Sequence, residues 1–143
     1  MEDGTARTRL QPEPEDRFVR LRAELGLTSF GLNQIVLRPG QRGRGCAHER
    51  QEEVYVVLEG TLSLVVEGEE TALERGELIR VAPGVRRQLL NRGPGNVHLL
   101  AIGGDGEHHG RDGQAFAAWD ATESAPPQET PLPGDLPASE LRS

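Results

Sequence analysis

The stretch that decides the fold of this chain is PGQRGRGCAHERQEEVYVVLEG, residues 39–60. A second stretch, GELIRVAPGVRRQLLN at residues 76–91, repeats the design, because each runs from a glycine turn into an apolar strand. Cys46, His48 and Glu53 follow one another along the first stretch. Thiolate, imidazole and carboxylate groups each offer a lone pair to a cation, so these three residues are candidate metal ligands.

The two stretches resemble the two sequence motifs of the cupin superfamily. The positions that match the motifs are Gly40, His48, Glu53, Gly60, Gly76, Pro83, Gly84 and Asn91. Two positions depart from them, since Cys46 and Arg87 stand where the family has histidines. The resemblance covers roughly residues 30–102, and the short gap between the motifs is typical of small bacterial cupins. It implies an all-β, cupin-type double-stranded β-helix, or jelly-roll barrel, with Cys46, His48 and Glu53 on the family's ligand positions.

Length and composition fit one domain and argue against several kinds of partner. The 143 residues suit a single domain, and with 35% apolar and 3% aromatic residues the core must come from Val, Leu and Ile. The net charge of −7 argues against a nucleic-acid or membrane-surface partner, because such partners require a basic patch. The single cysteine excludes an intramolecular disulfide. With no long apolar run and no secretory signal, we expect a cytoplasmic protein.

Two polar ends flank the middle of the chain. Residues 1–16 contain two prolines and no periodicity, which predicts a flexible segment, disordered or loosely docked. Residues 17–120 are expected to form the barrel, and the proline-rich residues 121–143 a disordered tail. Phe18–Leu25 fits a helix face and a strand face equally well, and Gln114–Trp119 is compatible with a short helix.

Short strands alternate with glycine and proline turns through the middle of the chain. The expected strands are residues 30–37, 53–59, 61–67, 71–74, 77–81, 87–91 and 97–102. Strands of this length and spacing indicate an antiparallel sandwich or barrel. Jelly rolls, the cupins among them, have this architecture.

Alternation along residues 53–59 divides the strand into two faces. Glu53, Tyr55 and Val57 share the face that the resemblance puts inside the barrel, and Gln51 is expected at its mouth. The other face is apolar and needs a cover, so we expect a homodimer. Its residues are Val54, Val56 and Leu58.

Arg87 decides whether a metal ion fits this interior. Arginine stays protonated and has no lone pair to donate, so it is not a ligand, and at about 4 Å it would repel a unit positive charge by about 4 kcal/mol. Three arrangements are open. Arg87 points outward and leaves three ligands, or it pairs with Glu53 in place of a metal, or it binds a carboxylate or phosphate of a substrate.

Other interpretations compete for the remaining candidate ligands. Cys46 also fits a small buried filler or a redox-active thiol, and His48 also fits a buried, hydrogen-bonded histidine. His98, in a late strand, is better explained as a core or interface histidine. The adjacent pair His108 and His109 is better explained as part of a solvated loop.

Two functions follow from these candidates. The first is a small-molecule-binding cupin whose cavity holds a small anionic metabolite near Arg87, with Tyr55 and Gln51 beside it. The alternative is a mononuclear metal-dependent enzyme of the dioxygenase or isomerase type, in which Cys46, His48 and Glu53 hold one zinc, iron, nickel or copper ion. The sequence favours the binding function, with or without a metal, and it names no substrate because one fold hosts many chemistries.

Overall fold

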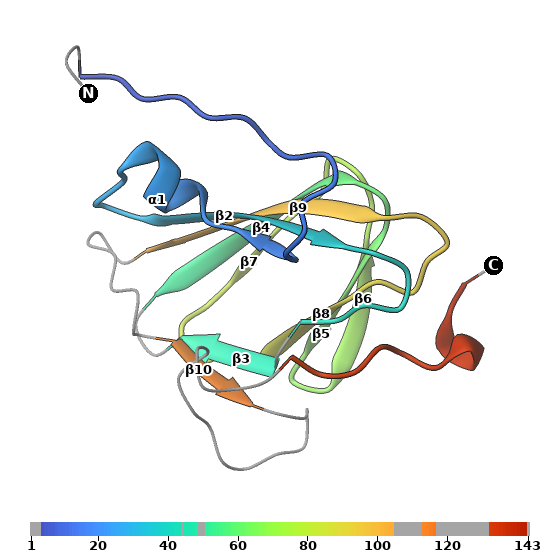
Figure 1. Ribbon diagram of the computed structural model, residues 1–143. Coiled ribbons are helices and arrows are strands. Elements are labelled where there is room, and N and C mark those ends of the chain that lie inside the picture. Colours follow the sequence, from blue (N-terminus) through green and yellow to red (C-terminus); the bar gives the residue numbers. More distant parts are fainter. Residues whose placement is uncertain (1–3, 44, 49–50, 105–112, 117–131, 143) are drawn as a thin grey trace.

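The computed structural model of the protein describes residues 4–43, 45–48, 51–104, 113–116 and 132–142, with 45–48 and 113–116 described by their backbone alone. Within these residues the chain forms ten strands, a short helix and a 3-10 turn (Figure 1). The strands are β1 (Phe18–Val19), β2 (Gly31–Leu37), β3 (Gly45–His48), β4 (Glu52–Glu59), β5 (Leu62–Val66), β6 (Glu69–Leu73), β7 (Leu78–Val81), β8 (Arg87–Leu90), β9 (Val97–Gly104) and β10 (Gly113–Phe116). The helix α1 is Leu21–Leu25 and the 3-10 turn η2 is Ala138–Glu140. Across these ranges, none of the helices has the length and apolar character needed to cross a membrane.

The strands form two five-stranded antiparallel sheets that face each other (Figure 1). Sheet A has the order β1-β2-β9-β4-β7, and sheet B has the order β10-β3-β8-β5-β6. Strands distant in the sequence are neighbours in both sheets, since β2 pairs with β9 and β3 with β8. This arrangement confirms the predicted all-β jelly roll.

The strands predicted between residues 30 and 102 are all present, with their ends shifted by no more than two residues. The ambiguous segment Phe18–Leu25 contains both elements, because β1 is followed at once by α1, which ends at the left-handed Gly26. The short helix expected over residues 114–119 is wrong for residues 114–116, which belong to β10 opposite β3. Pairing with an exposed strand edge outweighs local helix preference here. Trp119 lies outside the described residues.

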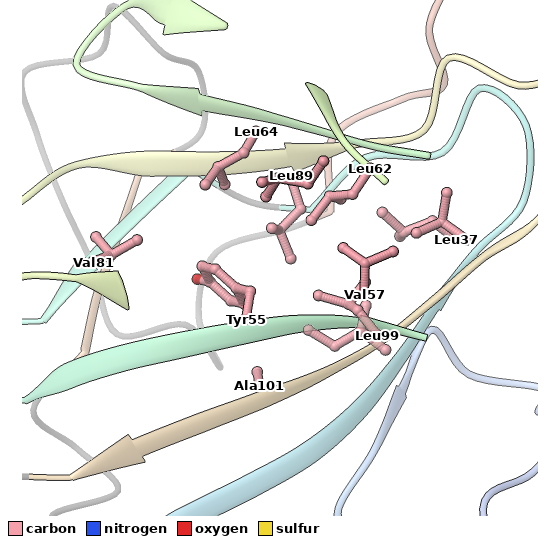
Figure 2. Close-up of a cluster of buried hydrophobic side chains, with 12 residues drawn as sticks. Leu37, Tyr55, Val57, Leu62, Leu64, Val81, Leu89, Leu99 and Ala101 are labelled. Atoms are coloured by element: carbon pink, nitrogen blue, oxygen red, sulfur yellow. The ribbon is translucent and has the colours of Figure 1, made fainter. Parts of the chain in front are cut away.

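The core lies between the inner faces of the two sheets and is built from aliphatic side chains around one tyrosine (Figure 2). Tyr55 and Val57 are 2% and 1% exposed, so the predicted inner face of β4 is confirmed. The buried cluster comprises Ile35, Leu37, Tyr55, Val57, Leu62, Leu64, Leu73, Val81, Leu89, Val97, Leu99 and Ala101.

The motif glycines and the motif asparagine hold the turns between strands. Gly40, Gly60, Gly76 and Gly84 all have φ between 80° and 90°, a conformation that side chains disfavour. Asn91 is fully buried, and its amide nitrogen donates to the carbonyls of Leu37 and Gly95 at 2.7 and 2.9 Å. Its side-chain oxygen accepts from the Gly93 backbone. These positions therefore specify the fold, not the chemistry of a site.

The N-terminal arm, residues 4–16, runs along the outside of sheet A (Figure 1). The carboxamide of Gln34 accepts a hydrogen bond from the Gln11 backbone N–H at 2.9 Å and donates to its carbonyl at 2.6 Å. Gln34 is 1% exposed, so these bonds satisfy a buried polar side chain. Of the two states expected for this segment, its described part is docked.

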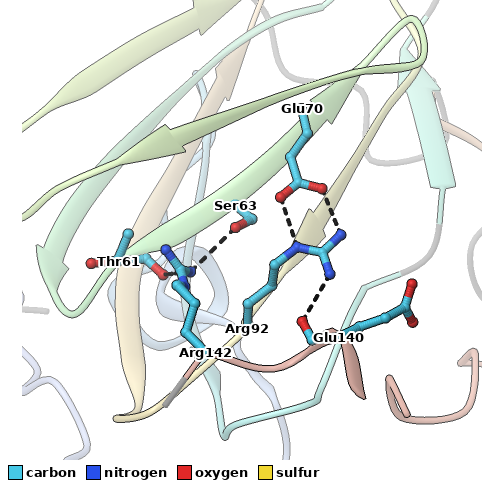
Figure 3. A network of polar contacts seen from close by, with 6 residues as sticks. All are labelled: Thr61, Ser63, Glu70, Arg92, Glu140 and Arg142. Atoms are coloured by element: carbon cyan, nitrogen blue, oxygen red, sulfur yellow. Dashed lines mark hydrogen bonds and ion pairs between the residues drawn. The ribbon is translucent and has the colours of Figure 1, made fainter. Parts of the chain in front are cut away.

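The C-terminal tail, residues 132–142, lies against sheet B, so the expected disorder of the range 121–143 does not hold for this part. Leu136 is buried, and its backbone N–H donates to the Gly40 carbonyl at 2.7 Å. Arg92 binds both oxygens of Glu70 and the carbonyl of Glu140, while Arg142 reaches Ser63 Oγ (Figure 3). The tail docks because it covers a sheet face that would otherwise be exposed. Residues 117–131 lie outside the described part.

Candidate functional site

The interior site is built from two strands of opposite sheets. Glu53 and Tyr55 lie two residues apart on β4 in sheet A, so alternation turns both toward the interior. Arg87 is the first residue of β8 in sheet B and reaches across to them. It is fully buried, whereas the Glu53 side chain is 14% exposed. The sequence therefore brings together three of its six candidate site residues at this point.

Arg87, Glu53 and Tyr55 form one hydrogen-bonded cluster. Arg87 Nη2 lies 2.8 Å from Glu53 Oε1, and Arg87 Nε donates to the Tyr55 hydroxyl at 3.2 Å. The Tyr55 hydroxyl in turn donates to Glu53 Oε1. A third donor, Arg87 Nη1, binds the Val85 carbonyl at 2.9 Å. Of the three arrangements left open by the sequence, the structure has the inward ion pair.

This ion pair does not fit a cation bound at Glu53 Oε1. That oxygen already accepts hydrogen bonds from a guanidinium and a phenol, and a cation placed there would stand a few ångströms from the arginine charge. Among the described side chains, no three His, Cys, Asp or Glu residues gather as a metal site would require.

Cys46 and His48 lie on β3, where only their backbone positions are described. Cys46 is directly opposite Arg87 in the register between β3 and β8, and His48 is opposite Gly113 of β10. The motif position of Cys46 is thus next to the cluster along the sheet. The side chains of Cys46 and His48 lie outside the described part, so their role as ligands stays a prediction.

Gln51 lies near the cluster, in the segment that leads into β4. It is 2% exposed, and its Oε1 and Glu53 Oε2 both lie close to Gly103 on β9. A Cβ atom built on Gly103 would be 3.8 Å from Gln51 Oε1 and 3.4 Å from Glu53 Oε2. A contribution of Gln51 to the mouth of the barrel stays a prediction.

The side chains on the inner face of sheet A become smaller along the strands in the direction of Glu53. The paired residues of β2 and β9 are, in order, Leu37 with Val97, Ile35 with Leu99, Asn33 with Ala101, and Gly31 with Gly103. We call the last four residues the small-residue floor: Gly31, Asn33, Ala101 and Gly103. In the same rows, β4 contributes Tyr55 opposite Ala101 and Glu53 opposite Gly103. The polar cluster thus stands beside the part of the sheet with the smallest side chains.

Asn33 is the residue that the sequence analysis missed. It shares a strand face with Ile35 and Leu37, because alternate residues of a strand point the same way. A polar residue in register with two core residues is the signal that could have identified it. Its pairing partner Ala101 is in turn opposite Tyr55, so Asn33 lies in the same row as the cluster.

His98 lies on the other side of sheet A, away from the cluster. Its Nε2 is 3.6 Å from Glu59 Oε2, beside an open trough of about 1420 Å³ that the N-terminal arm and the outer face of the sheet line. His98 is therefore not part of the core between the sheets, and its interpretation as an interface histidine stays a prediction. His108 and His109 lie outside the described residues.

The fold and this interior cluster define a small jelly-roll domain that carries polar chemistry at one end of its barrel. Residues 33–103 match the family model of the cupin domain. The chain belongs to the cupin superfamily.

Known proteins similar to this chain differ in what they do. This chain is 37% identical over 71 residues to the tetracenomycin polyketide synthase protein TcmJ of Streptomyces glaucescens. The aligned stretch covers 50% of this chain and 48% of that protein. It is 38% identical over 78 residues to the beta-D-galactosidase Rv1717 of Mycobacterium tuberculosis, covering 54% of this chain and 66% of that protein. The chain thus spans about half the length of the first curated relative and just under two thirds of the length of the second.

Among solved structures, the chain is similar to a cupin-superfamily sugar phosphate isomerase of Silicibacter pomeroyi. The TM-score is 0.62 at 25% identity, over 80% of this chain and 78% of that one. A cupin protein of Bacteroides fragilis gives a TM-score of 0.62 at 24% identity, over 71% of this chain and 84% of that one.

Proposed function

We propose that this protein binds a small, hydroxyl-rich molecule of the sugar class at the polar end of its barrel. The observation that carries the proposal is the hydrogen-bonded cluster of Arg87, Glu53 and Tyr55 beside the small-residue floor. Each sugar hydroxyl both donates and accepts hydrogen bonds. A cluster that offers donors and acceptors on one interior surface suits such a ligand.

The charge of the cluster decides which ligands of this class fit best. Arg87 was expected to hold an anion, but its charge is compensated by Glu53 at 2.8 Å. An anionic group would have to compete with this carboxylate for the guanidinium. We therefore expect a neutral sugar to bind at least as tightly as its phosphate ester.

Two similar proteins support the sugar class. By name, one is a sugar phosphate isomerase of the cupin superfamily and the other a beta-D-galactosidase. The function proposed here is binding, and no reaction is assigned to the cluster. The metal-dependent alternative depends on Cys46 and His48, and its test is the Arg87→His experiment described in the Discussion.

The experiment is a titration of ¹⁵N-labelled protein, followed by amide chemical shifts, with galactose, glucose and glucose 6-phosphate. Binding should move the amides of Ala101, Gly103 and Tyr55. Tyr55→Phe, which keeps the ring but removes the hydroxyl, should weaken binding about tenfold. Arg80→Gln, which changes an exposed residue on the outer face, should leave it unchanged. If no probe binds, or if the shifts map to the trough around His98, the proposal is wrong.

A further inference from the structure

Asn33 is the one polar residue on the inner face of β2. The other residues of that face, Gly31, Ile35 and Leu37, are buried, whereas Asn33 is partly exposed. At this point β2 is also open along one edge, because β1 pairs only with Gln34 and Ile35. Water therefore reaches an inward-pointing polar side chain at the polar end of the barrel.

The carboxamide of Asn33 forms no hydrogen bond with any residue that the structure describes. It is also not among the described side chains in which an unpaired nitrogen or oxygen is sealed from water, so both of its polar atoms are accessible. The groups of Arg87, Glu53 and Tyr55, by contrast, bond to one another. Asn33 thus offers two donors and an acceptor that the cluster has not already used.

The neighbours of Asn33 on sheet A leave its carboxamide uncovered. Its pairing partner on β9 is Ala101, and the next pair towards the polar end is Gly31 with Gly103. These residues have a methyl group or no side chain, so none of them reaches over the amide. Ala101 also lies between Asn33 and Tyr55, whose strands are about 10 Å apart because neighbouring strands are about 4.8 Å apart. A single sugar ring fits this span, with hydroxyls directed to both sides.

We propose that Asn33 is a specificity-determining residue, whose carboxamide binds two neighbouring hydroxyl groups of the ligand by donating to one and accepting from the other. This inference rests on the proposed function, which places a hydroxyl-rich ligand at the polar end of the barrel. It adds the feature of the ligand that is read, a pair of adjacent hydroxyls. An analogue that lacks one of these hydroxyls leaves the amide without its partner and is rejected.

The test compares the wild type with Asn33→Ala and with Asn96→Ala. The control makes the same change at an exposed asparagine in the loop between β8 and β9. Each protein is titrated with galactose and glucose and with the 2-deoxy, 3-deoxy and 4-deoxy forms of both sugars. Binding is followed by amide chemical shifts, and the melting temperature of each variant is recorded.

We expect Asn33→Ala to melt within about 3 °C of the wild type, because the amide makes no bond within the described protein. It should bind the parent sugar about tenfold more weakly. At least one deoxy sugar should bind the wild type and Asn33→Ala equally, because it lacks the hydroxyl that the amide contacts. Asn96→Ala should bind every probe as the wild type does.

Three results would overturn this inference while the proposed function stands, provided that the wild type binds a sugar and Tyr55→Phe weakens it. In the first, Asn33→Ala binds the parent sugar as tightly as the wild type does. In the second, Asn33→Ala weakens the parent sugar and all the deoxy sugars by the same factor, so the amide reads no hydroxyl. In the third, Asn33→Ala lowers the melting temperature by ten degrees or more, so its role is structural. If the wild type binds none of the sugars, both the inference and the proposed function fail.

Discussion

Glu52 and Glu53 are neighbours on β4 whose carboxylates form ion pairs in opposite surroundings. Glu52 pairs with Arg80 at 2.5 Å on the outer face, where the two side chains are 53% and 60% exposed. Glu53 pairs with Arg87 in the interior, where the exposed fractions are 14% and 0%. The two side chains differ in their surroundings because consecutive residues of a strand point to opposite faces of the sheet. The chain thus contains a buried ion pair and an exposed ion pair that share one strand.

These two pairs give a matched test of the interior cluster. Arg87→Met should lower the free energy of unfolding by about 3–5 kcal/mol, because it leaves the Glu53 carboxylate buried without its partner. Arg80→Met should change it by less than about 1 kcal/mol, because both charges of that pair are solvated. Urea unfolding of both variants measures the difference. Equal effects would show that the interior pair is not the stabilising contact described here.

Arg87 also controls whether the site accepts a metal ion. Arg87→His removes the guanidinium and puts an imidazole on the position where cupins have a histidine, so the affinity for a divalent cation should rise. The measurement is calorimetric titration with zinc and nickel after chelator treatment, with Arg87→Gln as the control that removes the charge without adding a ligand. Tight binding of one equivalent by the wild type, unimproved in Arg87→His, would favour the metal enzyme with Cys46, His48 and Glu53 as ligands.

Gly60 should be the least replaceable of the turn glycines. A Cβ on Gly60 would stand 2.3 Å from the Asn96 carbonyl oxygen, and its φ is +81°. Gly84 has almost the same φ, +80°, but open space around it. We expect Gly84→Ala to cost about 1–2 kcal/mol from backbone conformation alone, and Gly60→Ala to cost more than about 3 kcal/mol. Thermal unfolding of the two variants separates the steric clash with Asn96, present only at Gly60, from the backbone strain that both positions share. Equal losses of stability in the two variants would contradict the clash.

Acid should loosen the C-terminal tail. Hydrogen bonds from Arg92 hold the pKa of Glu70 below its ordinary value of 4.5. Because this pKa is lower in the folded than in the unfolded protein, the stabilisation is complete above pH 4.5 and is lost as the pH falls through the folded value. The Leu136 amide should then lose protection from hydrogen exchange.

The controls for this prediction lie on the same strand. Glu70→Gln should loosen the tail at neutral pH and remove its dependence on acid, whereas Glu69→Gln, on the adjacent exposed position, should behave as the wild type. An acid transition of the tail that persists in Glu70→Gln would assign it to another group.

The outer face of sheet A leads us to expect a homodimer. Val54, Val56 and Leu58 are only partly buried, and Leu78 beside them on the edge strand β7 is 62% exposed. The adjacent Glu52 and Arg80 carry opposite charges, so a two-fold axis that passes beside them would bring each near the complementary charge of the partner subunit. Sedimentation should give a dimer at micromolar concentration, Leu78→Glu should shift it to monomer, and Ala72→Glu on β6 should not. A monomeric wild type would exclude this interface.

The inner face of β4 was predictable because a period of two in a single strand fixes which residues share a face. The pattern placed Glu53, Tyr55 and Val57 on one face, and the resemblance to the cupin motifs put that face inside the barrel. The position of the Arg87 side chain was not predictable, because its alternatives differ in contacts made across two sheets, which a local pattern does not contain.

The docking of the tail and the strand β10 were missed for a related reason. Leu136 is one apolar residue in a proline-rich segment, and its burial depends on contacts beside Gly40 that only the folded barrel creates. Residues 113–116 are extended because β3 offers them an unpaired edge. Both features depend on the tertiary structure, so propensity gives no sign of them.

The pairing of β2 with β9 has a consequence for how the chain folds. Leu37 must find Val97, and the residues between them form most of the other strands, so neither half of the polypeptide has a complete sheet of its own. Chains dominated by such distant pairings fold slowly, on the order of milliseconds to seconds, because the entropy of closing long loops is lost before the contacts form. On the ribosome, sheet A cannot be completed until residue 104 has emerged. Two fragments cut at the turn around Gly76 should stay unfolded separately and regain structure only when mixed.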